Sequence, residues 1–149
     1  MTKIDAIREM AGQRARQLNA SYAGAATPTE AQSLREAAGA VIVDVRSRAE
    51  LDFVGRIPDS IEIEWKSWPG MKPNPDFMAQ LLRAVPKAAT VLFICRSGAR
   101  SHDAATAAAA EGYAQAFNVL EGFEGDRDPA GHRNTVGGWR AAGLPWTQS

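Results

Sequence analysis

Three short, largely apolar runs constrain the fold of this chain most strongly. They occupy residues 41–45, 90–94 and 117–120. Strands that are buried on both faces, as in a parallel sheet, read as continuous apolar runs, whereas half-exposed strands alternate. Segments with helical signals lie between or beside them, at residues 28–38, 76–84 and 101–111. Alternating strands and helices predict an α/β layered domain with a mainly parallel sheet.

The boundaries of several elements can also be predicted. Thr27 and Glu30 are spaced as a capping box with Pro28 at the first helical position, and Gly39 is placed to end that helix. We further expect a helix in residues 1–20, a strand or linker in 21–26, a short helix in 48–53, a half-exposed strand in 61–65, loops in 66–75 and 122–138, and a short helix in 139–142. We therefore divide the chain into an N-terminal helix and extension, 1–26, and one domain, 27–149.

Charge and cysteine content exclude several classes of protein. Seventeen basic and seventeen acidic side chains cancel, which argues against a nucleic-acid or membrane-surface partner. No apolar run is long enough to span a membrane, and residues 1–10 lack the apolar core of a signal peptide. The single cysteine excludes an internal disulfide and a four-thiolate zinc site. We expect a cytoplasmic protein without a metal ion.

That cysteine, Cys95, directly follows the apolar run 90–94 and precedes the predicted helix 101–111. Ligands of open α/β sheets bind beyond the carboxyl ends of the strands. A loop that curls before a helix can aim several backbone N–H groups at one point and so bind an anion. Gly98 gives this loop conformational freedom. The setting favours a reactive thiolate on Cys95, or a persulfide anion held by the same N–H groups.

A second interpretation of Cys95 has to be weighed. A cysteine at the end of an apolar strand is often only a small, inert hydrophobic residue. Here, however, it is followed by two arginines, a glycine and two serines within residues 96–101. A core cysteine requires no such neighbours, so the sequence favours a reactive site.

The chain resembles the single-domain rhodanese family over roughly residues 27–146. The motifs occur in the family's order: Asp44-Val45-Arg46, Glu50, Phe53, Gly55, Ile57-Pro58, the loop 95–101, Gly112-Tyr113, the segment 119–122, Trp139 and the segment 143–145. The loop motif is specific, and the ordered combination is more so. The resemblance implies a rhodanese-like three-layer fold, with a central, mainly parallel sheet and helices on both faces.

The resemblance also implies an activity. A rhodanese-type sulfurtransferase would move sulfane sulfur from thiosulfate or a persulfide donor, through a Cys95 persulfide, to an acceptor such as a thiol, cyanide or a protein. Cys95 would be catalytic, and its loop would bind the substrate through Arg96, Ser97, Gly98, Ala99, Arg100 and Ser101. No cofactor is expected. The loop 95–100 is one residue shorter than in related phosphatases and arsenate reductases, which argues against phosphatase activity.

Three residues upstream are expected to support the site. The resemblance puts Asp44 near the base of the loop, where it either tunes the site or is structural. Arg46 and Glu50 are spaced for a mainly structural ion pair of the i, i+4 type.

The sequence departs from the family pattern in three places. Arg56 replaces a frequent histidine and Asp59 a frequent glycine, both expected to lie away from the loop. The family also has two glycines directly after the last strand, whereas here Gly122 is followed by Phe123. A glycine pair comes only before Trp139, after residues 124–136. We call residues 124–136 the insertion, and expect it to shape access to the site or to bind a partner.

Other candidates and functions stay open. We expect His102 and His132 to be solvated rather than proton donors, Phe77 to be buried, and the exposure of Trp68 to be undetermined. A second hypothesis is a sulfur-relay or binding module with little thiosulfate turnover. A third is a regulatory domain without turnover, against which the presence of Cys95 and both loop arginines counts.

Overall fold

The computed structural model of the chain describes residues 2–149 and contains a five-stranded sheet. The strands are ordered β1, β7, β6, β2, β3, and every neighbouring pair is parallel. They comprise β1 (Gly24–Ala26), β2 (Val41–Asp44), β3 (Ile61–Glu62), β6 (Val91–Ile94) and β7 (Ala116–Val119). The predicted α/β class with a mainly parallel sheet is confirmed.

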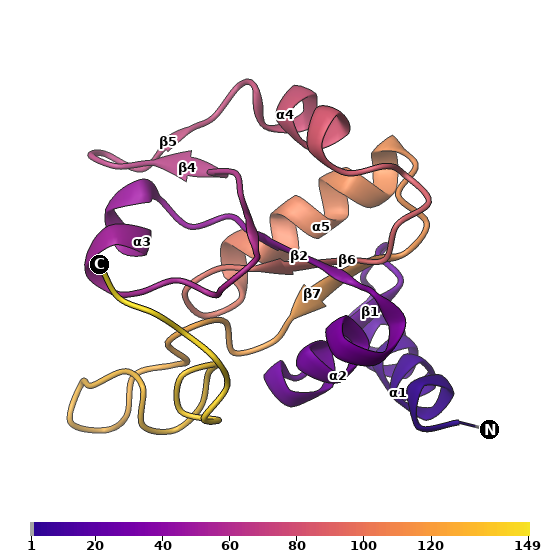
Figure 1. The fold of residues 1–149 in the computed structure, drawn as a ribbon, viewed down its shortest axis with the longest axis horizontal. Helices are drawn as coiled ribbons and strands as arrows, with labels where there is room; N and C mark the ends of the chain where they lie inside the picture. Colours follow the sequence, from indigo (N-terminus) through magenta and orange to yellow (C-terminus); the bar gives the residue numbers. More distant parts are fainter. Residues whose placement is uncertain (1) are drawn as a thin grey trace.

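Alternate residues of the central strands point to opposite faces of the sheet and form two cores. In β6, Val91 and Phe93 join one core, whereas Leu92 and Ile94 join the other. The first core contains residues of α4 (Phe77–Ala84) and α5 (Ala99–Glu111), and the second contains residues of α1 (Lys3–Gln17) and α2 (Pro28–Ala38). Ala15, near the end of α1, belongs to the first core. Figure 1 shows these helix pairs on opposite sides of the sheet. Burial on both faces explains why the central strands are continuous apolar runs.

Helix boundaries follow capping signals in the sequence. Thr27 accepts a hydrogen bond from the backbone N–H of Glu30, and the Glu30 carboxylate accepts one from the N–H of Thr27. This completes the predicted capping box of α2, which ends at Gly39 in the left-handed conformation. A second capping box, formed by Ser47 and Glu50, begins α3 (Arg48–Phe53). Glu50 is therefore held at the start of a helix by local bonds.

Two predicted elements differ from the structure. The strand expected at 61–65 pairs only over β3, and the helix expected at 139–142 is a series of turns. Trp139 is fully buried, and its indole N–H donates to the carbonyl of Pro145, 2.8 Å away. Positive φ at Gly138 and Gly143 brackets this segment, so the chain turns back on itself instead of continuing as a helix.

The proline-rich segment 66–75 contains a small antiparallel ribbon within the expected loop. Strands β4 (Lys66–Ser67) and β5 (Lys72–Pro73) form it, and we call them the ribbon. Trp68 and Met71 lie at its tip; Trp68 is 63% exposed. Phe77, in contrast, is buried as expected, and packs edge-on against Trp65.

The N-terminal segment is closely associated with the sheet. Strand β1 pairs with β7 along the sheet edge, and α1 packs against β1. The Arg14 guanidinium forms two hydrogen bonds with the Glu30 carboxylate, at 2.6 and 3.0 Å, and so links α1 to α2. No helix within residues 2–149 has the length and apolarity needed to cross a membrane.

Candidate active site

The centre of the site is the junction between β6 and α5, at the carboxyl edge of the sheet. β6 ends at Ile94, and α5 begins at Ala99, two residues earlier than the sequence predicts. We call residues 95–100 the cysteine loop. Gly98 is the N-cap residue of α5, with φ 112°, a conformation that side chains other than glycine rarely adopt. The first two residues of α5, Ala99 and Arg100, are therefore part of the loop. The N–H groups of the first turn of a helix have no partner within the helix.

Cys95 is almost completely buried, and its sulfur lies among hydrogen-bond donors. Its Sγ accepts a hydrogen bond from the backbone N–H of Gly98 at 3.1 Å and lies 3.3 Å from the hydroxyl of Ser101. Polar donors around a sulfur at a helix N-terminus stabilise a negative charge on it. The backbone N–H of Gly98 and the hydroxyl of Ser101 thus lie beside the Cys95 sulfur.

Asn118 is a residue of this site that the sequence reasoning did not single out. It is buried in β7, and its Nδ2 donates to the carbonyl of Gly98 at 3.3 Å. Its Oδ1 lies 2.6 Å from the Ser101 hydroxyl, whose single proton is donated either to Asn118 or to the Cys95 sulfur. A polar residue at the centre of a buried strand requires hydrogen-bond partners. That rule could have identified Asn118 from the sequence as a residue bonded to a neighbouring loop.

The segment after β7 forms backbone hydrogen bonds with the first two residues of the cysteine loop. The backbone N–H of Phe123 donates to the carbonyl of Cys95 at 2.8 Å, and that of Glu124 donates to Arg96 at 3.0 Å. Gly122 has φ 66°, and a Cβ there would lie 2.5 Å from the Cys95 carbonyl oxygen. Glycine is therefore required at this one position. Gly138, two residues after the insertion, packs against Gly125 near the start of the insertion, and a Cβ at Gly138 would lie 2.6 Å from the Gly125 nitrogen.

The two loop arginines have different partners. Arg96 is exposed, whereas the Arg100 guanidinium forms two hydrogen bonds with the Glu50 carboxylate, at 2.7 and 2.9 Å. Burial alone would raise the pKa of Glu50, but Arg100 and Ser47 stabilise the carboxylate and lower its pKa to about 2. Burial opposes the charge on Arg100 as well, yet Glu50, with smaller contributions from Cys95 and Asp44, raises the Arg100 pKa. The Glu50–Arg100 pair is thus charged over the whole physiological range.

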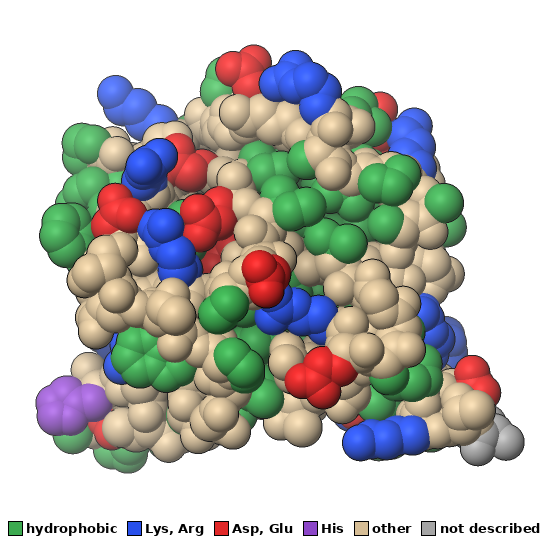
Figure 2. Space-filling view, in the orientation of Figure 1, with side chains coloured by type: hydrophobic (Ala, Val, Ile, Leu, Met, Phe, Trp, Pro, Cys, Tyr) green, Lys and Arg blue, Asp and Glu red, His purple; other side chains and the backbone are tan. Residues whose placement is uncertain are grey.

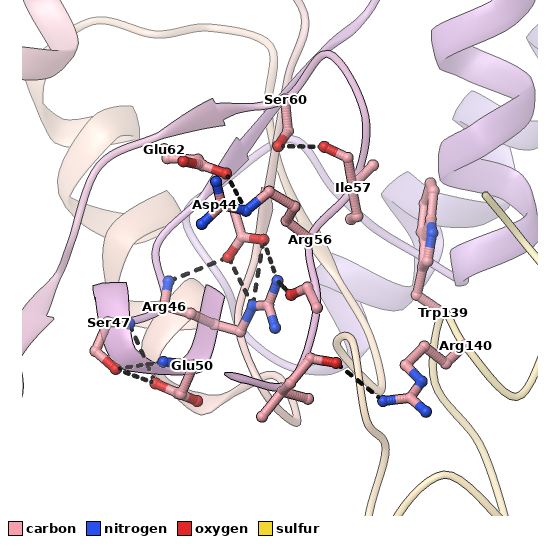
Figure 3. A network of polar contacts seen from close by, with 12 residues as sticks. Asp44, Arg46, Ser47, Glu50, Arg56, Ile57, Ser60, Glu62, Trp139 and Arg140 are labelled. Carbon is pink, nitrogen blue, oxygen red and sulfur yellow. Dashed lines mark hydrogen bonds and ion pairs between the residues drawn. The ribbon is translucent and has the colours of Figure 1, made fainter. Parts of the chain in front are cut away.

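The predicted ion pair between Arg46 and Glu50 is wrong. Arg46 pairs with Asp44, Nη2 to Oδ2 at 2.7 Å, and both side chains are completely buried (Figure 3). Its Nη2 also donates to the carbonyl of Gly55, and its guanidinium carbon lies 4.0 Å from the ring centroid of Phe123. Arg46 precedes the N-cap of α3, so the i, i+4 geometry, which requires a helix, does not apply.

The pairing of β2 with β6 places Asp44 next to the start of the cysteine loop. In the parallel pairing of β2 with β6, Asp44 is opposite Ile94, the residue before Cys95. Its carboxylate accepts hydrogen bonds from both the backbone and the side chain of Arg46. The Asp44–Arg46 pair therefore fixes the end of β2 next to the loop and does not contact Cys95 by a hydrogen bond.

Two hollows flank the cysteine loop. One, of about 570 Å³, is lined by α3, the tip of the ribbon, Arg96, Arg100 and the insertion residues Glu124 and Arg133. We call it the arginine pocket. The other, of about 560 Å³, is lined by Ser97 and by insertion residues that again include Arg133. The insertion thus lies alongside the loop and forms walls of both hollows.

Neither histidine contacts the cysteine. The Nδ1 of His102 is hydrogen-bonded to the Tyr22 hydroxyl at 2.9 Å, and its side chain is exposed. His132 is exposed on the insertion, where its backbone N–H donates to Asp128 at 2.8 Å. Within residues 2–149 no cluster of His, Cys, Asp and Glu side chains is arranged to bind a metal ion.

Several known proteins are similar to this chain in sequence or in fold. The crystal structure of Rv0390 from M. tuberculosis is 43% identical, covers 86% of this chain and 99% of its own, and superposes with a TM-score of 0.78. An uncharacterized protein of Rickettsia conorii, RC0915, is 35% identical over 111 residues, which are 72% of this chain and 82% of that protein. A sulfurtransferase of Allochromatium vinosum is 32% identical over 92 residues, which are 62% of this chain and 76% of the relative.

The family assignment covers most of the chain. The Rhodanese-like domain family matches residues 27–127, a range that contains the cysteine loop, β2 and the start of the insertion. Together with the sulfurtransferase relative, this match supports sulfur transfer as the general class of chemistry. By the match over two thirds of its length and by the resemblance carried by its cysteine loop, the chain is a member of the rhodanese-like family.

Proposed function

We propose that the protein is a sulfurtransferase that carries a sulfane sulfur as a persulfide on Cys95. The observation that carries the proposal is the environment of the Cys95 sulfur. It lies at the N-terminus of α5, 3.1 Å from the Gly98 nitrogen and 3.3 Å from the Ser101 hydroxyl. Such a set of donors stabilises both a thiolate and the terminal anion of a persulfide.

The reaction we propose has two steps and involves no cofactor. In the first, the Cys95 thiolate attacks the sulfane sulfur of thiosulfate or of a persulfide donor. The bond within the donor breaks and its electron pair leaves on sulfite, or on the donor thiolate. In the second, a nucleophile such as cyanide or a thiolate attacks the outer sulfur of the Cys95 persulfide. The sulfur–sulfur bond breaks, and the Cys95 thiolate is regenerated.

The other residues have distinct proposed roles. The backbone of Ser97, Gly98 and Ala99 and the hydroxyl of Ser101 would surround the transferred sulfur. Arg96 and Arg100 would attract the anionic donor, since charge-assisted contacts to arginine are strong and directional. Asp44, Arg46 and Glu50 would act indirectly, by fixing the loop and by orienting Arg100.

A turnover experiment tests this proposal. Wild-type protein is incubated with thiosulfate and cyanide, and thiocyanate is measured over time. We expect steady thiocyanate formation by the wild type and none by Cys95→Ser. A rate that survives in Cys95→Ser would contradict the role of Cys95. Hydrolysis of an aryl phosphate that depends on Cys95 would favour a phosphatase instead.

The insertion motivates a second candidate, a sulfur-relay module that receives its persulfide from a dedicated protein. Residues of the insertion line both hollows beside the cysteine loop, where a partner could contact the site. A relay would form the Cys95 persulfide from a sulfane donor but give negligible thiocyanate turnover. A chain with one cysteine and no internal disulfide fits a reducing compartment, and on that ground we propose the cytoplasm.

A further inference from the structure

The arginine pocket is assembled from segments that are far apart in the sequence. Phe53 of α3 and Trp68 and Met71 of the ribbon tip provide apolar surface, and Arg96 and Arg133 add charge. In the space-filling view, hydrophobic side chains line the left edge of the molecule over α3 and the ribbon, beside charged side chains of both signs (Figure 2). The pocket is therefore both apolar and charged, and it adjoins the cysteine loop.

The pocket is larger than a small inorganic donor requires. Its volume of about 570 Å³ falls within the roughly 300–1,000 Å³ of pockets that enclose organic ligands of drug size. A thiosulfate or cyanide ion is only a few atoms in size and has no apolar surface. Neither ion would contact Phe53 or Trp68 in a way that stabilises binding, so the size of the pocket fits an organic molecule.

Two aromatic side chains of the pocket are unusually exposed. Phe53 is 79% exposed and Trp68 is 63% exposed. Aromatic side chains that stay accessible beside a hollow are characteristic of binding sites, because a ligand that covers them gains free energy by removing apolar surface from water. The occupant of the pocket should therefore carry an apolar body.

The charges of the pocket favour an anion. Arg100 is neutralised by Glu50, but within residues 2–149 neither Arg96 nor Arg133 forms an ion pair, and Arg133 donates only to the carbonyl of Gly125 at 2.7 Å. Glu124 is the remaining acidic side chain of the wall, so one positive charge is in excess. In the second hollow, by contrast, Arg127 and Arg133 are balanced by Asp126 and Asp128.

We propose that the arginine pocket binds an organic thiol with an apolar body and a carboxylate, as the acceptor of the sulfane sulfur. This inference rests on the proposed sulfurtransferase function. The acceptor thiolate attacks the outer sulfur of the Cys95 persulfide, a new sulfur–sulfur bond forms, and the electron pair of the broken bond returns to Cys95. The product is an organic persulfide, which in the reverse direction is a donor.

Three matched thiols test the proposal. The protein is loaded with sulfane sulfur from thiosulfate and freed of excess donor. It is then mixed with one of three thiols. The first is 4-(mercaptomethyl)benzoate, and the second is 4-(mercaptomethyl)benzyl alcohol, in which a neutral alcohol replaces the carboxylate. The third is mercaptoacetate, which has the carboxylate but no aromatic body. Loss of the persulfide is followed by mass spectrometry at several thiol concentrations, with cyanide as the reference acceptor. We expect saturation with the benzoate, at a half-saturating concentration about tenfold lower than for either analogue.

Variants connect the preference to the pocket. Trp68→Ala is expected to raise the half-saturating concentration of the benzoate about tenfold relative to that of cyanide. Arg133→Gln is expected to reduce the preference for the benzoate over the alcohol. Met10→Ala is the matched control, since Met10 is 53% exposed and lies on α1, outside both hollows; all its rates should equal those of the wild type.

Several results would contradict the proposed thiol acceptor. Equal reactivity of the three thiols, or a preference that survives in Trp68→Ala, would overturn the proposal. So would transfer to cyanide without saturation by any of the thiols, which would point to a protein acceptor. If no donor forms a Cys95 persulfide at all, the proposed sulfurtransferase function itself fails, and that failure is visible before any acceptor is added.

Discussion

Two ion pairs that begin within the same short stretch of sequence differ in burial and in surroundings. Asp44 pairs with Arg46, and both side chains are completely buried. Glu50 pairs with Arg100, fifty residues away, and its side chain and that of Arg100 are 19% and 12% exposed. The first pair lies among the end of β2, Gly55 and Phe123, whereas the second borders the arginine pocket.

From this difference in burial we propose that the Asp44–Arg46 pair is structural and that the Glu50–Arg100 pair orients an arginine of the site. A fully buried pair stabilises little by itself, but removal of one partner leaves a charge in an apolar environment. Breaking a partly exposed pair lowers the free energy of unfolding less, and the arginine of such a pair can still contact a ligand. A third pair in this stretch, Arg48 with Asp52, is on the surface. The three pairs are thus ranked by burial, and the following predictions test whether the effect of breaking each pair follows that ranking.

The largest effect is expected from Arg46→Met. The change leaves the Asp44 carboxylate buried without its partner, which should lower the free energy of unfolding by about 3–5 kcal/mol. Urea unfolding of the variant and the wild type measures the difference. The double variant Asp44→Asn/Arg46→Met removes both charges and should recover a substantial part of the loss. A loss below that of the surface pair would contradict the structural role.

Acid should weaken the Glu50–Arg100 pair. The pKa of Glu50 is about 2 in the folded protein, below its ordinary value of 4.5. Because the folded pKa is the lower one, the pair stabilises the fold above pH 4.5, and this contribution is lost as the pH falls from 4.5 towards 2. We expect the Glu50→Gln variant to lack about 1–2 kcal/mol of this pH-dependent stability, after allowance for solvent screening.

Denaturant midpoints measured against pH check that expectation. The pH-dependent difference between wild type and Glu50→Gln should be largest near neutral pH and disappear below about pH 2. Glu9→Gln, which removes an exposed carboxylate of α1, is the matched control and should shift the curve little. A Glu50→Gln difference that is constant with pH would show that the carboxylate charge is not involved.

Glu50→Gln should also change catalysis, because Arg100 loses the carboxylate that orients it. We expect kcat/KM for thiosulfate to fall about tenfold, mostly through KM. Steady-state thiocyanate kinetics measure the change. Glu50→Asp keeps the charge and should restore part of the loss. An unchanged KM for thiosulfate would mean that Arg100 does not contact the donor.

The smallest effect is expected at the surface pair. Arg48 is 84% and Asp52 41% exposed, so Arg48→Ala should change the free energy of unfolding by at most about 0.5 kcal/mol. Thiocyanate turnover should be equal to that of the wild type. A destabilisation comparable to that of Arg46→Met would invalidate the ranking by burial.

The parts of the fold that the sequence predicts are those with local or repetitive signals. β2 and β6 are continuous apolar runs because both faces of the sheet are covered, and Thr27 with Glu30 marks the start of α2 through bonds within one turn. The cysteine loop is predictable because its short motif joins a strand to a helix. Each of these signals lies within a few neighbouring residues.

What the sequence did not predict depends on long-range partners. The choice of Arg100 as the partner of Glu50 arises only when α3 and α5 meet in the fold. Asn118 appears as one polar residue in a strand until β7 brings it beside Ser101 and Gly98. Similarly, the turns at 139–142 are set by glycine conformations and by the buried Trp139, which override a weak helical signal.

The most direct test of the account is an intact mass spectrum of the protein after incubation with thiosulfate, followed by peptide mapping. Wild-type protein should gain the mass of one sulfur atom, located on Cys95 and removed by cyanide. Cys95→Ser should gain nothing under the same conditions. A wild-type mass that stays unchanged with thiosulfate and with an organic persulfide would contradict a persulfide on Cys95, and with it the proposed sulfur transfer.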